Sequence, residues 1–229
     1  MNLLGFDTAT AATATAVLRA DGAGFEARHD PAPGERPGHA TRLLGLVEEV
    51  LAAAGLEPGQ VDRIAVGTGP GSFTGLRIGV ASARALVQSA GAELVGVSTL
   101  RTLAVGAGPP TGTTALAVID ARRGEAFAAA WRGSTQVMAP AALGPEALAR
   151  AVAELPEPVL AVGDGAIRFR GSLEPAGATV PPDRDRLHRV GALHTCRLGA
   201  EAEPDRRDQI LPEYLRLPDA EAAARQPDR

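Results

Sequence analysis

The chain contains no lysine: all 23 of its basic side chains are arginine, set against 27 acidic ones, and the formal net charge is −4. The missing lysine indicates biased codon usage, since alanine, glycine and proline are abundant. Proteins that bind nucleic acid by themselves gather positive charge against phosphates. A mildly acidic chain is therefore a poor candidate for contacting nucleic acid on its own.

Cysteine and long apolar runs are also scarce. The one cysteine, Cys196, excludes an internal disulfide and is typical of a reducing compartment. With only His194 nearby, a reactive thiol is not expected. No apolar run approaches the roughly 18 residues that span a bilayer, and the N-terminus has neither a basic segment nor a small-residue cleavage site. These absences predict a cytoplasmic protein with no membrane partner.

The predicted elements fall into two groups separated by a segment rich in glycine and proline, 106–113. After this segment the strand–turn–strand pattern restarts, which predicts a second lobe on the plan of the first. A length of 229 residues suits two such lobes. We therefore place an N-terminal lobe at residues 1–107 and a smaller C-terminal lobe at 108–229, which ends in an extended return segment at 209–215.

Alternating apolar residues predict the strands, and apolar residues at helical spacing predict the helices. We expect strands at 2–7, 13–19, 24–29, 63–67, 93–97, 115–120, 125–131 and 158–162. Helices are expected at 39–54, 76–89, 99–105, 145–155 and 187–202, tight turns at 21–22, 120–124 and 163–165, and loops at 31–38 and 171–186.

The most distinctive motif is the glycine-rich stretch 67–79, which joins an apolar strand to a long helix. The first turn of a helix has free N–H groups and a favourable dipole, so this stretch is a candidate phosphate site. A P-loop would add lysine and a hydroxyl residue after its last glycine; here Leu76 and Arg77 follow Gly75. We favour a structural role, in which glycines allow positive φ angles and close packing of the helix.

Several motifs together resemble the TsaB (YeaZ) family, whose members are subunits of the bacterial machinery that makes N6-threonylcarbamoyladenosine in tRNA. The resemblance implies a two-lobed α/β fold of the actin, sugar-kinase and Hsp70-like ATPase superfamily. It spans nearly the whole chain. The motifs are Gly5-Phe6-Asp7-Thr8-Ala9-Thr10, 69–79 (Gly-Pro-Gly-Ser-Phe-Thr-Gly-Leu-Arg-Ile-Gly), 95–100 (Val-Gly-Val-Ser-Thr-Leu), 120–125 (Asp-Ala-Arg-Arg-Gly-Glu) and Tyr214-Leu215-Arg216.

The catalytic paralogue of that family, TsaD, has acidic residues and a metal-binding His-x-x-x-His pair where this chain has others. The positions comparable to the acidic residues are Ala11 and Ala12, and those comparable to the histidines are Thr99 and Leu103. None of these side chains supplies a carboxylate or an imidazole to a metal. The comparison implies no catalytic residue and no metal site in this chain, with metal and ATP on partner subunits.

A vestigial phosphate or nucleotide cleft is one interpretation of the polar residues that follow the first strand of each lobe. The structural interpretation, which we favour, is that Asp7 caps a turn and Thr8 bonds to buried backbone. Asp120 is the counterpart of Asp7 in the second lobe and is expected to pair with Arg122 and Arg123. The candidate cleft residues are Asp7, Thr8, Gly69, Gly71, Ser72, Thr74, Arg77 and Asp120.

The two long helices of the first lobe carry apolar stripes, which by default face a core. The family resemblance implies that these helices also form a bundle with the same helices of TsaD or of a second copy, so we expect a partner interface on them. Which side is core and which is interface stays open at this point. The candidate interface residues are His39, Leu43, Leu44, Val47, Val50, Leu76, Val80, Ala83 and Leu86.

The resemblance therefore implies a non-catalytic dimerisation and activating subunit. Its expected partners are TsaD in a heterodimer, TsaE and tRNA through the complex, and a second copy when the chain is alone. Two alternatives are an independent nucleotide-binding ATPase and a glycoprotease-like hydrolase. For the hydrolase alternative, the sequence shows no Ser-His-Asp, Cys-His or zinc constellation.

Overall fold

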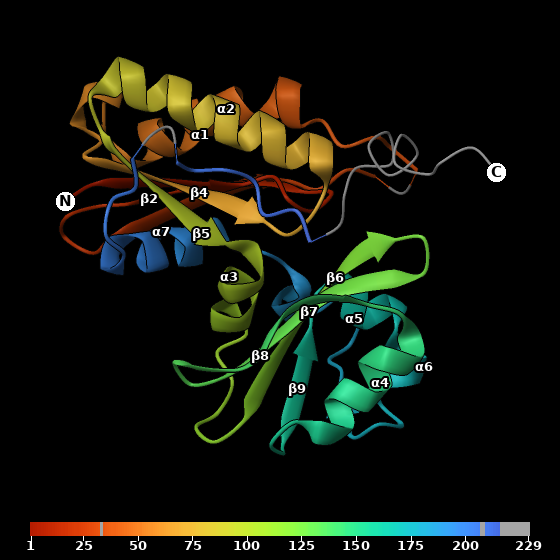
Figure 1. Cartoon of the computed structure of the whole chain (residues 1–229). Coiled ribbons are helices and arrows are strands. Elements are labelled where there is room, and N and C mark those ends of the chain that lie inside the picture. Colours follow the sequence, from red (N-terminus) through yellow and green to blue (C-terminus); the bar gives the residue numbers. More distant parts are fainter. Residues whose placement is uncertain (33, 207–208, 216–229) are drawn as a thin grey trace.

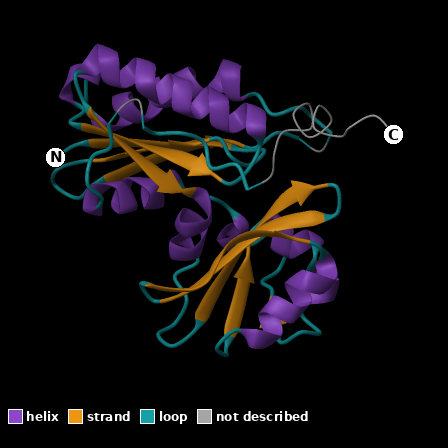
Figure 2. Cartoon of the chain, viewed as in Figure 1, coloured by secondary structure: helices purple, strands orange, loops and turns teal. Residues whose placement is uncertain are grey.

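The computed structural model describes residues 1–32, 34–206 and 209–215. The chain forms two lobes, each built on a five-stranded mixed sheet with helices packed on its faces (Figures 1 and 2). The first sheet spans residues 3–98 and the second spans 114–179, so they lie on either side of the predicted linker. Within the described residues, no helix is both long and apolar enough to cross a membrane.

The first sheet has the strand order β3-β2-β1-β4-β5. The first three strands form an antiparallel meander, and β4 and β5 run parallel to β1. Helices α1 and α2 cover one face of this sheet and α7 covers the other (Figure 1). The elements are β1 (Leu3–Asp7), β2 (Thr13–Leu18), β3 (Gly24–His29), α1 (His39–Ala54), η1 (Pro58–Gln60), β4 (Arg63–Gly69), α2 (Phe73–Ala90), β5 (Glu93–Ser98) and α7 (Ala192–Glu201).

The second sheet repeats this plan with the order β8-β7-β6-β9-β10. Its first three strands are again an antiparallel meander, and β9 and β10 again run parallel to the first strand. Helix α3 packs on one face of this sheet and connects the lobes. The elements are α3 (Thr99–Gly106), β6 (Thr114–Arg122), β7 (Glu125–Arg132), β8 (Thr135–Leu143), α4 (Pro145–Glu154), β9 (Val159–Val162), α5 (Asp164–Arg168), α6 (Arg170–Leu173), β10 (Ala178–Thr179) and η2 (Arg186–His188).

The matching topology makes β6 the counterpart of β1, as the restarted sequence pattern predicted. Asp7 ends β1, and Asp120 lies close to the end of β6. Both aspartates therefore lie at or close to the end of the central strand of their sheet, and the turn after β1 and the end of β6 line one cavity.

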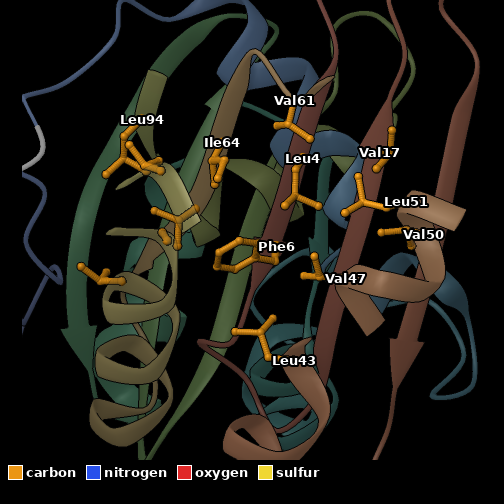
Figure 3. Packing of buried hydrophobic residues seen from close by; sticks show 14 of the residues in the cluster. Leu4, Phe6, Val17, Leu43, Val47, Val50, Leu51, Val61, Ile64 and Leu94 are labelled. Carbon is orange, nitrogen blue, oxygen red and sulfur yellow. The ribbon is translucent and has the colours of Figure 1, made fainter. Parts of the chain in front are cut away.

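The first-lobe core lies between its sheet and the inner sides of α1 and α2. Leu43 and Val47 of α1 point from the helix toward Phe6 of β1 (Figure 3). Their spacing of four residues places them one above the other on one side of a helix. Gly55 ends α1 in the left-handed conformation, with φ 65°, as expected for the residue that follows a helix.

Several predicted elements of the second half of the chain are wrong. The helix expected at 187–202 is a short 3₁₀ turn followed by α7, because Gly191 interrupts it. The turn expected at 163–165 is the start of α5, and strand β8 was not predicted. The loop expected at 171–186 contains the end of α6 and β10. Residues 209–215 return to the first lobe without forming a strand, and Arg216 lies outside the described residues.

Candidate functional site

Asp7 ends β1 and is held by the chain's own groups. One carboxylate oxygen accepts the Ala9 N–H at 2.8 Å, and the other accepts the Thr99 hydroxyl at 2.7 Å. A Cβ on Gly67 would collide with this carboxylate, so the glycine leaves the space that Asp7 occupies. Burial raises the pKa of Asp7, and the two hydrogen bonds act in the opposite direction. The predicted turn-capping role of Asp7 is confirmed.

The start of α2 packs directly on the turn after β1. The Thr8 hydroxyl donates to the carbonyl of Gly75 at 2.8 Å, as its structural interpretation predicted. A Cβ on Gly75 would collide with the Thr8 carbonyl, which explains the need for glycine there. The Ser72 N–H donates to the Ala9 carbonyl at 2.7 Å, and the Ser72 hydroxyl accepts from Gly75 at 3.3 Å. The chain itself therefore uses N–H groups that a phosphate would need.

A cavity of about 370 Å³ lies between the two lobes. Four predicted cleft residues line it: Gly71, Ser72 and Thr74 from the first lobe and Asp120 from the second. The structure does not bring the others into this lining. Asp7 and Thr8 are buried, Gly69 is buried at the end of β4, and Arg77 lies over the Phe73 ring at 4.1 Å from its centre.

Two carboxylates of the cavity were not singled out from the sequence. Asp164 begins α5 and accepts the Asp120 N–H at 3.0 Å, and burial raises its pKa. Glu213 belongs to the return segment, and burial raises its pKa as well. A signal existed for Asp164, because it follows β9 in a Gly-Asp-Gly sequence. Glu213 could not be found this way, because it reaches the cavity only through the return of the chain.

Asp120 is paired with arginines of its own lobe. Arg168 lies 2.9 Å from its carboxylate and Arg122 lies 3.4 Å from it. The pairing with Arg122 was predicted, whereas Arg168 is brought in by α5. Arg122 and Arg123 both have positive φ angles, 64° and 52°, at the tight β6–β7 turn.

The superfamily fold implies a nucleotide between the lobes. The residues that line this cavity do not fit the phosphates of a nucleotide. Among the described residues that line it, Arg122 alone has a positive side chain, and this side chain pairs with Asp120. With that pairing, the described lining offers no unpaired positive side chain to a triphosphate. Nor does the described part of the chain contain a group of three or more His, Cys, Asp or Glu that could hold a metal.

A second hollow, of about 270 Å³, lies between α1 and α2 and is mostly apolar. We call it the α1–α2 groove. Leu44 of α1 and Leu86 of α2 form its walls, and Val47 contributes to its floor. Leu44 has 54% of its surface exposed, and it lies beside other apolar residues of the groove lining. The groove is therefore an apolar surface that the chain does not cover.

Most of the predicted interface residues lie in the first-lobe core, and Val47 alone among these buried residues also reaches the groove lining. Side chains that are 0–4% exposed have no surface to offer another protein. His39 is one of them: its ring lies 2.8 Å from the Thr13 hydroxyl, and burial lowers its pKa. Leu44 and Leu86 remain at the surface. The residues that belong to the core are His39, Leu43, Val47, Val50, Leu76, Val80 and Ala83.

The family model that matches the chain is TsaD, tRNA N6-adenosine threonylcarbamoyltransferase, over residues 35–157. A curated relative, the tRNA threonylcarbamoyladenosine biosynthesis protein TsaB of Escherichia coli, is 41% identical over 128 residues, which cover 56% of this chain and 53% of that protein. The match thus spans about half the length of this relative. An uncharacterized protein of Mycobacterium tuberculosis is 34% identical over 97% of this chain and 95% of its own length.

Among solved structures, YeaZ from Pseudomonas aeruginosa is similar with a TM-score of 0.74 and 26% identity, covering 93% of this chain and 100% of the other. A second structure from that organism, described as similar to peptidase YEAZ, has a TM-score of 0.76 and 27% identity, over 94% and 99%. A hexokinase of Thermus thermophilus, at TM-score 0.50 and 12% identity over 88% and 99%, supports the two-lobed actin and sugar-kinase fold alone.

Proposed function

The chain belongs to the TsaB (YeaZ) family, and from this premise we propose that it takes part in the biosynthesis of threonylcarbamoyladenosine in tRNA. The proposal rests on the family-model match and on the curated relatives named for this process. Within the process, the chain is a non-catalytic subunit that binds and activates a TsaD-type protein. The observation that carries this role is the uncovered α1–α2 groove, together with an interlobe cavity that does not fit nucleotide phosphates.

The α1–α2 groove is the proposed docking site, and its occupant is the equivalent helix pair of a TsaD-type protein. The TsaD family model matches residues 35–157, a range that contains both α1 and α2. A TsaD-type partner therefore has similar helices, and two similar surfaces can pair around an approximate two-fold axis. Small exposed side chains on the outer sides of both helices, Gly45 and Ala52 of α1 and Ala81 and Ala85 of α2, allow helices to approach closely.

The remaining roles are assigned to the partners. This chain requires no cofactor, and ATP and metal belong to the partner subunits. TsaE and tRNA are reached through the complex, which agrees with the net charge of −4. In the absence of TsaD, a second copy occupies the same groove and gives a homodimer. The cytoplasmic location is part of the same proposal.

The test is to place a charge in the groove and measure the complex. Leu44→Glu is expected to weaken binding to TsaD by at least about 30-fold, because a charge at an apolar interface costs on the order of 2 kcal/mol or more. Light scattering of the mixture and threonylcarbamoyl transfer to tRNA are the measurements. The matched control is Leu211→Glu, the same change at another leucine that is exposed outside the groove.

Leu43→Glu separates folding from binding on the same helix. Leu43 is 1% exposed, so a charge there is expected to unfold the first lobe, as seen by circular dichroism. Folded Leu44→Glu protein that binds and activates TsaD as well as the unchanged chain would contradict the docking site. TsaD that transfers the group at full rate without this chain would contradict the activating role.

A further inference from the structure

The chain returns from the second lobe to the first through α7 and then runs toward the cavity. We call residues 209–215 the strap. Its first part is anchored in the first lobe: Ile210 is buried in the core cluster beneath α1 and α2, and its carbonyl accepts from Arg84 of α2 at 2.6 Å. Just before the strap, the Asp205 N–H donates to Leu94 at the edge of β5 at 2.8 Å. Ile210 and Asp205 therefore anchor the chain to the first lobe.

The last part of the strap touches both lobes. The Glu213 N–H donates to the Thr68 carbonyl of β4 at 2.7 Å, and the Tyr214 ring lies 5.0 Å from the Phe73 ring at the start of α2. Leu215 packs against the hydrophobic cluster of the second sheet, which includes Ile119. Three consecutive residues therefore join the two lobes across the cavity.

The same three residues form one wall of the cavity. Glu213, Tyr214 and Leu215 line it together with residues of both lobes. These residues are less buried than Ile210, which is 4% exposed, and they are held by one backbone hydrogen bond, one ring contact and one partly buried leucine. Tyr214 keeps 40% of its surface exposed. Local opening takes place where few buried contacts hold a segment. Residues 213–215 are therefore a weakly held part of the cavity wall.

We propose that residues 213–215 are a latch that closes the interlobe cavity and holds the lobes together. When the Tyr214–Phe73 contact and the Glu213–Thr68 hydrogen bond break, the latch swings away from the anchored Ile210 and the cavity opens. The latch seats on the first turn of α2, the helix whose other end forms a wall of the α1–α2 groove. The inference concerns this chain alone, so it does not depend on the proposed complex.

A thiol placed in the cavity reports its opening. Ala11→Cys introduces a small, half-buried thiol into the lining. The native Cys196 gives no signal in the folded chain, because it is buried and this burial raises its pKa to about 12. The rate of maleimide labelling of Ala11→Cys is measured with the unchanged strap, with Tyr214→Ala and with Leu211→Ala.

Tyr214→Ala is expected to raise the labelling rate by about fivefold or more, the effect of losing one aromatic pair. Leu211→Ala is the matched control in the same strap, since Leu211 is 67% exposed and does not line the cavity; its rate should stay within about twofold of the unchanged strap. Tyr214→Phe keeps the ring contact and should also label at the original rate. Phe73→Ala removes the seat of the latch and should accelerate labelling as Tyr214→Ala does.

A second reporter, Ala53→Cys on the exposed side of α1, shows whether a variant has loosened the whole fold. Its labelling should be the same in every background, and circular dichroism should show native secondary structure. Equal labelling of Ala11→Cys with and without Tyr214 overturns the latch. Acceleration by Leu211→Ala to the same degree also overturns it, because a general loosening of the strap would then explain the result.

Discussion

At the scale of single residues, buried polar side chains hold the turn where β1 meets α2. Asp7 and Thr8 have the residue types of a phosphate site, yet each has partners inside the first lobe. Burial of an unpaired carboxylate would be costly, and the Thr99 hydroxyl and Ala9 N–H offset part of this cost. The turn is therefore held by the chain's own hydrogen-bonding groups.

The raised pKa of Asp7 makes a prediction about stability and pH. Because the pKa of Asp7 is higher in the folded than in the unfolded chain, the native state holds this proton more tightly. The stability that protonated Asp7 contributes is therefore complete below the ordinary pKa of about 3.8 and is lost as pH rises through the folded pKa. Asp7→Asn removes this loss. Its free energy of unfolding in urea, relative to the unchanged chain, should therefore improve as pH rises toward neutral.

Asp30 provides a control of opposite sign. A side-chain hydrogen bond from Arg28 lowers the pKa of Asp30 in the folded chain. The ionised Asp30 carboxylate therefore stabilises the fold at pH values above the ordinary pKa of an aspartate, and this contribution is lost as pH falls through the folded pKa. Asp30→Asn should lose stability toward neutral pH relative to the unchanged chain. Parallel pH profiles for Asp7→Asn and the unchanged chain would mean that Asp7 does not titrate differently on folding.

At the scale of elements, close approach decides where α2 can begin. Ser72 caps the helix, and Gly75 and Gly79 let its first turns lie against Thr8. The next turns carry Val80 and Ala83 into the core. The groove end of the helix lies farther along, at Leu86 and Ser89. One helix thus packs on the turn after β1, fills the core and forms a wall of the groove.

Two glycine-to-alanine changes distinguish close packing from helix propensity. Gly75→Ala should destabilise the chain by about 1–3 kcal/mol or more, because its methyl group would meet the Thr8 carbonyl. Gly45→Ala, in exposed α1 with nothing near the added atom, should stabilise it by about 0.5–1 kcal/mol. Chemical unfolding of the two variants is the measurement. Equal effects would show that α2 does not pack against Thr8 as described.

At the scale of the whole molecule, two lobes with sheets of matching topology meet at a cavity lined by residues of both. The repeated plan is similar in fold alone to that of a hexokinase of Thermus thermophilus. The walls come from the turn after β1, the start of α2, the end of β6, α5 and the strap, which lie far apart in sequence.

Magnesium ATP is expected to leave the melting temperature within about 1 °C at millimolar concentration. A nucleotide present at 100 times its dissociation constant would add about 2.7 kcal/mol, which corresponds to several degrees for a chain of this size. The physical reason is the lining of carboxylates, with Arg122 already paired. Differential scanning calorimetry is the measurement. A rise of several degrees that Asp7→Ala abolishes would support the ATPase alternative.

The sequence by itself determined the repeated two-lobe plan, the presence of the two long helices and the family motifs. These depend on local turn chemistry and on the periodicity of apolar residues, which one segment specifies alone. Tertiary structure decided which side of α1 and α2 is core, so Leu43 is buried while its neighbour Leu44 is exposed. It also brought Asp164, Arg168 and Glu213 to the cavity region, because contacts between distant segments depend on how the chain returns in space.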